Sequence, residues 1–215
     1  TDPIWDGSGV VVSPWHWMWL MKTKAESSPV KAIKEAQDAT RNGYKQALME
    51  IRAGRKSSHW IWYVWPSLVG VRKTSRPQYS LRDLKDVESF LRDGTLRQRL
   101  MEISEVAHGH LSNGVKPEAL FGARVDVEKF RECCTCFALV AVSSGDRPLA
   151  ELMTQCLASL GGALDPSTVE HLSKELKDFA EAKSVDDLHP PEAPDVAVPS
   201  ETVQSPDSAA DDSMA

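Results

Sequence analysis

The chain has 215 residues, of which 41% are hydrophobic and 26% are charged. This composition is typical of a soluble globular protein, and the length suffices for one ordinary domain with residues to spare. No stretch approaches the roughly 20 consecutive apolar residues of a membrane-spanning helix, so no transmembrane segment is expected. Four cysteines are too few for a scaffold built from disulfides, and the expected compartment is a reducing one, the cytoplasm or the nucleus.

Residues 1–29 are predicted to form an aromatic N-terminal arm or linker. The chain begins at Thr1 rather than Met, so an incomplete or processed N-terminus is expected. Trp15, Trp17 and Trp19 alternate along an apolar run that is too short to span a bilayer. In an extended chain their indoles would share one face, which suits a protein partner, a membrane interface or a strand that covers the core.

Between residues 30 and 183 the apolar residues follow the three-and-four spacing of α-helices almost throughout. The pattern predicts five or six helices. The first follows an apolar stripe from Ile33 to Ile51, and the next three have start signals at Ser80, Thr95 and Asp126. Two more are predicted from Pro148 to Leu160 and from Asp165 along a stripe to Phe179. The segment from Cys133 to Val142 is apolar on almost every side, which predicts a helix in the middle of a bundle. The predicted fold class is therefore all-α, a compact single-domain bundle.

The segment from Ser57 to Pro66, with the sequence SSHWIWYVWP, is unusually aromatic. Both of its faces are apolar apart from His59, and Pro66 cannot continue a regular helix. Each of its four large aromatic rings can bury about 150–250 Å². We therefore expect a short helix or an extended connector that packs in the core against the helix of the cysteines.

Residues 184–215 differ in charge from the rest of the chain. They contain eight acidic side chains and no Lys or Arg, whereas the other 23 acidic residues nearly balance all 25 basic ones. The same stretch holds five prolines and no aromatic residue, so it cannot bury enough apolar surface to offset the entropy of ordering. It is predicted to be a disordered acidic tail that keeps the protein soluble, shields a basic patch or binds a protein partner.

Three motifs of the chain resemble a known family. They are YKQALMEIRAGRKSSHWIWYVWP from residue 44, the positions Gly70, Ser75 and Tyr79, and FGARVDVEKFRECCTCF from Phe121 to Phe137. Together they resemble the family filed as domain of unknown function 1810, whose bacterial members are often labelled calpastatin. The resemblance covers residues 36–137 and continues to about Leu172. It implies a compact all-α fold, in agreement with the periodicity, and it implies no established activity.

The ionisable positions inside these apolar motifs are the candidates for chemistry. His59 would act as a general base or bind a ligand, Lys129 would hold an anion, and Asp126 would orient either one. The predicted ligand-binding residues form a polar notch, which consists of Lys56, Ser58, His59, Trp62, Asp126 and Lys129. The alternative is structural, with Asp126 as a helix N-cap that pairs with Lys129, and with His59 as a tie between helices. An open cleft beside these residues would favour binding, and a closed pair without a cavity would favour structure.

Residues 51–82 contain seven Lys or Arg side chains and no Asp or Glu around the aromatic cluster. This mixture suits a small anionic ligand such as a phosphate or a nucleotide, which is the leading hypothesis. The alternatives are a non-enzymatic structural or protein-interaction domain and, third, a protein that binds single-stranded nucleic acid. The nearly neutral body argues against duplex nucleic acid.

The sequence does not decide whether the protein is an enzyme, and it predicts no cofactor. A metal site is not predicted either. Cys133, Cys134 and Cys136 lie on different faces of one predicted helix and lack the paired spacing of a zinc site. They are expected to be buried thiols.

Overall fold

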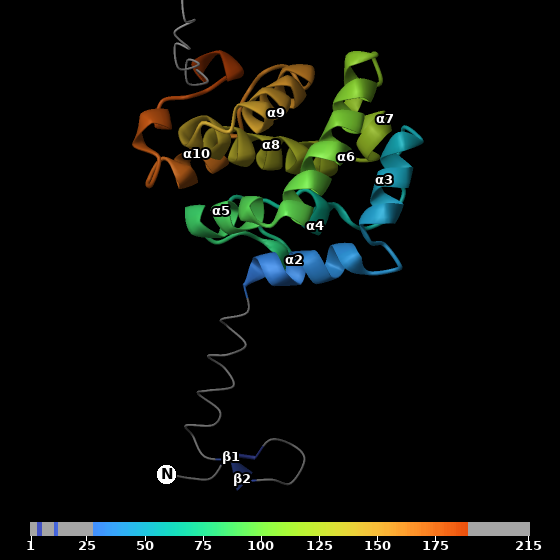
Figure 1. Cartoon of the computed structure of the whole chain (residues 1–215), viewed down its shortest axis with the longest axis vertical. Coiled ribbons are helices and arrows are strands. Elements are labelled where there is room, and N and C mark those ends of the chain that lie inside the picture. Colours follow the sequence, from blue (N-terminus) through green and yellow to red (C-terminus); the bar gives the residue numbers. More distant parts are fainter. Residues whose placement is uncertain (1–3, 6–10, 13–27, 189–215) are drawn as a thin grey trace, which may run out of the picture.

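The computed structural model describes residues 4–5, 11–12 and 28–188. Within these residues it contains nine α-helices and three short 3-10 helices, which confirms the all-α class (Figure 1). The number of helices exceeds the expected five or six because some of them have only four to seven residues. None of the described helices combines the length and the hydropathy needed to cross a bilayer.

Two short strands lie within the predicted N-terminal arm. β1 (Ile4–Trp5) pairs with β2 (Val11–Val12) in an antiparallel arrangement. The tryptophans at positions 15, 17 and 19 lie outside the described residues.

The predicted helix along the stripe from Ile33 to Ile51 is two helices, α2 (Pro29–Asp38) and α3 (Tyr44–Arg52). The expectation of one helix was wrong because the turn between them keeps the apolar stripe in register. Thr40, which the stripe places inside, is exposed. Asn42 adopts a left-handed backbone conformation with φ of 56°, which ends helical geometry before Gly43.

The next two helices begin at aspartates. α5 (Leu84–Arg92) has Asp83 as its N-cap, whose side chain accepts a hydrogen bond from the backbone N–H of Asp86. α6 (Gly94–Ser112) is capped by Asp93. The start signals at Ser80 and Thr95 were therefore wrong by a few residues, because aspartates at the true boundary satisfy the free N–H groups.

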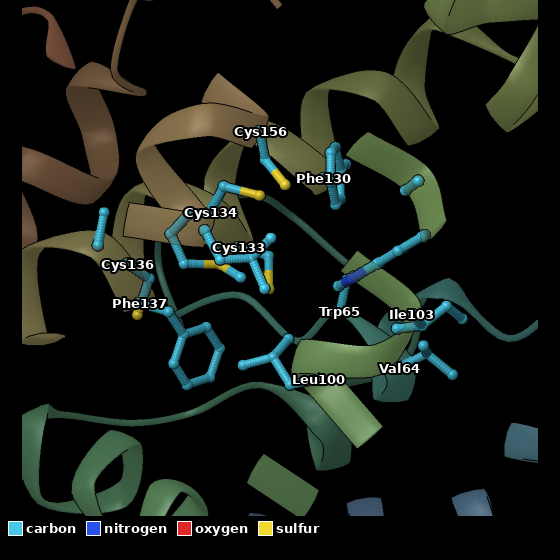
Figure 2. Close-up of a cluster of buried hydrophobic side chains, with 14 of the residues drawn as sticks. Val64, Trp65, Leu100, Ile103, Phe130, Cys133, Cys134, Cys136, Phe137 and Cys156 are labelled. Atoms are coloured by element: carbon cyan, nitrogen blue, oxygen red, sulfur yellow. The ribbon is translucent and has the colours of Figure 1, made fainter. Parts of the chain in front are cut away.

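The central helix is α8 (Arg124–Ser144), which follows the short helix α7 (Pro117–Phe121) that the sequence analysis missed. α8 packs most extensively against α9 (Arg147–Ser159) and also contacts α4, α5, α7 and α10. All four cysteines are fully buried in this core, as expected for three of them (Figure 2). The prediction of a central apolar helix is confirmed.

In the C-terminal part of the described chain, the last α-helix is shorter than expected, and the packed part of the chain extends further than expected. α10 (Pro166–Leu172) ends before Phe179, which lies in a separate 3-10 helix, Lys177–Phe179. The boundary of the predicted tail at Ser184 requires a correction. A further 3-10 helix, Val185–Asp187, contacts α9, and Leu188 is only 4% exposed. The apolar side chains of Val185 and Leu188 pack against the core, so these residues belong to the folded domain. Residues 189–215 lie outside the described part.

Candidate functional site

The aromatic segment folds as a short helix, α4 (Ile61–Val64), with a fully buried tryptophan on each side. The ring of Trp65 lies 4.6 Å from that of Phe130 and 5.5 Å from that of Phe121, measured between centroids. Its indole N–H donates to the hydroxyl of Ser104 over 3.0 Å. Phe130 belongs to α8, so the expected anchoring of this segment against the helix of the cysteines is confirmed (Figure 2).

The carboxylate of Glu50 organises the turn that leads into α4. It accepts hydrogen bonds from the backbone N–H groups of Ser57 and Ser58, from the Ser58 hydroxyl and from the indole of Trp60. Burial alone would raise the pKa of Glu50, but these donors outweigh it and lower the pKa to about 2. Ser58 is thus held by Glu50 within the fold.

Two buried ammonium groups share one buried carboxylate beside α4. The Oδ2 atom of Asp126 lies 2.7 Å from Nζ of Lys56, and its Oδ1 atom accepts a hydrogen bond of 3.1 Å from Nζ of Lys129. All three residues are at most 9% exposed. Asp126 is not the N-cap of α8, which begins two residues earlier at Arg124, so that expectation was wrong. Its carboxylate faces the two lysines instead.

This Lys56–Asp126–Lys129 triad carries a net charge of +1, because one carboxylate faces two ammonium groups. Buried charges in proteins are normally matched, since removing an ion from water costs several kcal/mol. An ammonium group has three N–H donors, and the protein hydrogen bond of the Lys129 ammonium within the described residues is the one to Asp126. The triad therefore offers a positive charge and spare donors that an anion would match.

Lys129 borders a cleft of about 240 Å³, which we call the Lys129 cleft. The ammonium lies 4.7 Å from the centroid of the Trp62 ring, in a cation–π contact. The lining combines cations, hydroxyl groups and apolar side chains and contains no acidic residue: Trp62, Trp65, Ser67, Arg72, Lys73, Thr74, Ser75, Ser80, Val125 and Lys129. Cations and hydroxyl groups are the side chains that bind phosphate and carboxylate oxygens.

Arg72 fixes the loop at the edge of this cleft. Its Nε atom donates to Glu132 over 2.7 Å, and its Nη2 atom donates to Glu128 over 2.9 Å, so the loop is tied to α8 at two points. Glu132 is only 2% exposed, and burial raises its pKa, while the hydrogen bond and charge of Arg72 oppose that increase. The guanidinium is thus committed to α8, whereas Lys73 beside it makes no ion pair within residues 28–188.

A second cleft of about 510 Å³ adjoins the first, because Trp62 and Ser75 line both. We call it the His59 cleft, and its lining also contains no acidic residue: Ala36, Ala39, Arg41, Asn42, His59, Trp62, Tyr63, Ser75, Arg76 and Tyr79. The exposed ring of His59 stacks on Trp62 with centroids 6.4 Å apart. The Arg76 guanidinium carbon lies 5.6 Å from the centroid of the same indole.

The structure joins four of the six predicted notch residues, namely Lys56, Trp62, Asp126 and Lys129. It places the other two elsewhere. Ser58 belongs to the Glu50 turn, and within residues 28–188 no hydrogen bond or ion pair links the imidazole of His59 to the triad. The expectation that His59 sits directly beside a carboxylate was therefore wrong, because its ring stacks on Trp62 and faces a different cleft.

Sequence reasoning missed several residues that shape these clefts. Glu50 stood in the family motif but received no role, because a carboxylate that caps a turn seven residues later gives no recognised sequence pattern. Ser67 and Thr74 gave no signal, because an isolated hydroxyl residue has no pattern. Arg72, Lys73 and Arg76 were noted as part of the basic segment.

The described part of the chain contains no cluster of side chains that could bind a metal ion. No three His, Cys, Asp or Glu side chains come together there in a way that would hold an ion. Burial raises the pKa of the thiols of Cys133, Cys134 and Cys136 well above the ordinary value. These thiols are therefore protonated and packed as apolar groups.

The chain is similar to a protein of known structure and matches the model of a protein family. The chain is similar to the conserved hypothetical protein Rv1873 from Mycobacterium tuberculosis, with 27% sequence identity and a TM-score of 0.58 over 68% of this chain and 97% of that one. No curated protein matches the chain. The model of the family described as "Protein of unknown function (DUF1810)" matches residues 29–172, which include α4, the triad and both clefts. The chain therefore belongs to the DUF1810 family.

Proposed function

We propose that this domain binds a small phosphate-bearing anion in the Lys129 cleft. The observation that carries the proposal is the unmatched positive charge of the buried triad. Lys129 belongs to the triad and also lines the cleft, so a ligand there would lie next to the residue that carries the unmatched charge. A phosphate oxygen beside this ammonium would supply the missing counter-charge and accept a spare N–H donor.

The carboxylates nearest to the cleft support the same proposal. Asp126 pairs with two lysines, and Glu128 pairs with both Arg72 and Arg124. Arg72 also pairs with Glu132, so each of these three acids faces at least one cation, which reduces its repulsion of an arriving anion. Lys73 adds a further positive charge to the lining.

The structural alternative rests on a different observation. Glu50 with its serines and the closed Lys56–Asp126 pair would stabilise the fold whether or not a ligand binds. A second lysine on the same carboxylate adds one hydrogen bond to such a tie but costs the desolvation of a further charge. The position of this second lysine, Lys129, beside a cleft favours the binding function.

The test is the stabilisation of the intact chain by inorganic phosphate, compared between the wild type and Lys129→Met. This substitution leaves a neutral Lys56–Asp126 pair and places an apolar side chain against Trp62, so the variant is expected to fold. A ligand at 100 times its dissociation constant stabilises the folded state by about 2.7 kcal/mol. We expect thermal or urea unfolding to show this increase for the wild type and its loss in Lys129→Met.

Phosphate also stabilises folded proteins in general by exclusion from their surface, so only the difference between variants counts. Lys85→Met is the matched control, because Lys85 is exposed on α5 and lines neither cleft. It should respond to phosphate like the wild type. An equal response of all three proteins would contradict the proposal.

A further inference from the structure

The two clefts meet at the Trp62 indole, which lines both of them. Lys129 approaches the indole from the first cleft at 4.7 Å, whereas His59 and Arg76 approach it from the second at 6.4 and 5.6 Å. Ser75 also lines both clefts. A ligand whose phosphate lies beside Lys129 would therefore extend past Trp62 and Ser75 into the His59 cleft.

The lining of the His59 cleft is rich in aromatic rings. Four of its lining residues are aromatic, and three of these rings, those of His59, Trp62 and Tyr79, are at least partly exposed. The fourth, Tyr63, holds Tyr79 in place with an edge-on contact of 5.1 Å and fixes itself by donating its hydroxyl proton to the Asn42 carbonyl. Rings held in this way form a platform on which a flat heterocycle stacks.

The cations of this cleft point to the same kind of ligand. Neither Arg76 nor Arg41 makes an ion pair within the described residues, and no acidic side chain lines the cleft. Guanidinium groups stack on planar rings and bind phosphate oxygens, so they suit a heterocycle attached to a phosphate. The volume of about 510 Å³ lies in the range of small-molecule sites.

We propose that the ligand is an aromatic phosphate of the mononucleotide class, with its phosphate beside Lys129 and its base in the His59 cleft. This inference rests on the proposed function for the phosphate half and adds the base half. Stacking on His59 and Tyr79 provides the affinity for the base, and the wall formed by Trp62 sets the distance between the two halves.

The experiment compares three probes on the intact chain by isothermal titration calorimetry: inorganic phosphate, ribose 5-phosphate and AMP. AMP carries the adenine base at the position where ribose 5-phosphate carries its anomeric hydroxyl group. Base–aromatic stacking is worth about tenfold or more in affinity. We expect AMP to bind at least tenfold more tightly than ribose 5-phosphate.

Two variants separate the halves of the site. His59→Ala and Tyr79→Leu should each remove most of the tenfold advantage of AMP and leave the affinity for ribose 5-phosphate unchanged. His59 is exposed, so its variant should fold normally, and Leu retains the apolar contact of the partly buried Tyr79. His110→Ala is the matched control, since His110 lines neither cleft, and it should bind all probes like the wild type.

Each outcome addresses one half of the site. Equal affinity for AMP and ribose 5-phosphate, with both lost in Lys129→Met, would overturn the base site and support the phosphate site. Binding of AMP that depends on His59 but not on Lys129 would overturn the proposed function instead. Absence of binding by any probe would overturn both, and a single-stranded oligonucleotide that binds more tightly than AMP would contradict the small-ligand class.

Discussion

Glu50 is the residue on which the turn before α4 depends most. Five donors converge on its carboxylate: the Gln46 amide, the Ser58 hydroxyl, the Trp60 indole and two backbone N–H groups that no helix or strand satisfies. The charged form accepts these bonds better than a neutral carboxyl group, which is why they lower the pKa to about 2 against the effect of burial. The turn before α4 thereby places Trp60 in the core.

Replacing this carboxylate tests its contribution and its pH dependence. Glu50→Gln should lower the free energy of unfolding at pH 7 by about 1–3 kcal/mol, because hydrogen bonds to a charged acceptor are weakened. The folded-state pKa of about 2 lies below the ordinary value of 4.5, so this contribution is complete above pH 4.5 and is lost as the pH falls towards 2. Urea unfolding across this range should show the difference between the two proteins shrink.

The matched control for this substitution is Glu105→Gln, which removes an exposed carboxylate from α6. Its stability should differ from that of the wild type by less than about 0.5 kcal/mol, as for most surface substitutions. A wild-type advantage over Glu50→Gln that persists unchanged to pH 2 would contradict the role assigned to the carboxylate.

The Lys56–Asp126–Lys129 triad predicts an order of stability. Asp126→Asn leaves two buried ammonium groups without a counter-charge and should cost about 3 kcal/mol or more, as expected when a buried pair is broken. Lys129→Met leaves a matched pair and should cost about 1 kcal/mol or less. Urea unfolding of both variants checks this order, and equal losses would mean that the two lysines do not share the carboxylate.

At the scale of elements, the turn between α2 and α3 is the point where the chain departs from a regular helix. Gly43 has an extended backbone, but a side chain at this position would collide with the carbonyl oxygen of Ala39. In the same turn, the backbone carbonyl of Asn42 accepts a hydrogen bond from the Tyr63 hydroxyl. It therefore positions one wall of the His59 cleft.

Gly43→Ala should destabilise the protein by about 1–3 kcal/mol, because the backbone of the turn must shift to admit a methyl group. Gly94→Ala is its control. Gly94 lies at the start of α6 with no atom within 4 Å of an added methyl group, so alanine there should be neutral or stabilise by up to about 1 kcal/mol. Thermal unfolding of the pair measures the difference, and similar effects at both sites would show that the turn is not restricted.

The elements that could be predicted are those whose apolar stripe is interrupted at their ends. Gly94 ends the stripe of α5, and the almost wholly apolar segment from Cys133 identified the central helix. α2 and α3 could not be separated, because the turn between them preserves the spacing of the stripe. α7 was missed because five residues are too short for a periodic signal.

At the scale of the whole molecule, α8 and α9 enclose the thiols in a core without solvent access (Figure 2). The native protein should therefore be almost unreactive toward a thiol reagent such as dithionitrobenzoate, because the thiolate is the nucleophile and burial raises the pKa of Cys133, Cys134 and Cys136. In denaturant all four cysteines should react. Rapid labelling of the folded chain would contradict this packing.

The clefts could be predicted only in part, and the reason is the distance in sequence between their walls. The basic and aromatic segment identified one wall, and the family motif supplied Lys129 for the other. The contacts between Lys56 and Asp126 and between Arg72 and Glu132 each join residues that lie 60 or more positions apart in the sequence. No local pattern contains such a pairing.

The most direct test of the anion site is a crystal structure of the intact chain grown with tungstate, a heavy analogue of phosphate that is located by its anomalous scattering. We expect a tungstate in the Lys129 cleft, within hydrogen-bond distance of Nζ of Lys129 and in contact with a hydroxyl group of the lining. The same crystals of Lys129→Met should lack it. A cleft that stays empty at saturating tungstate, or an ion that stays in place in Lys129→Met, would show that Lys129 does not form an anion site.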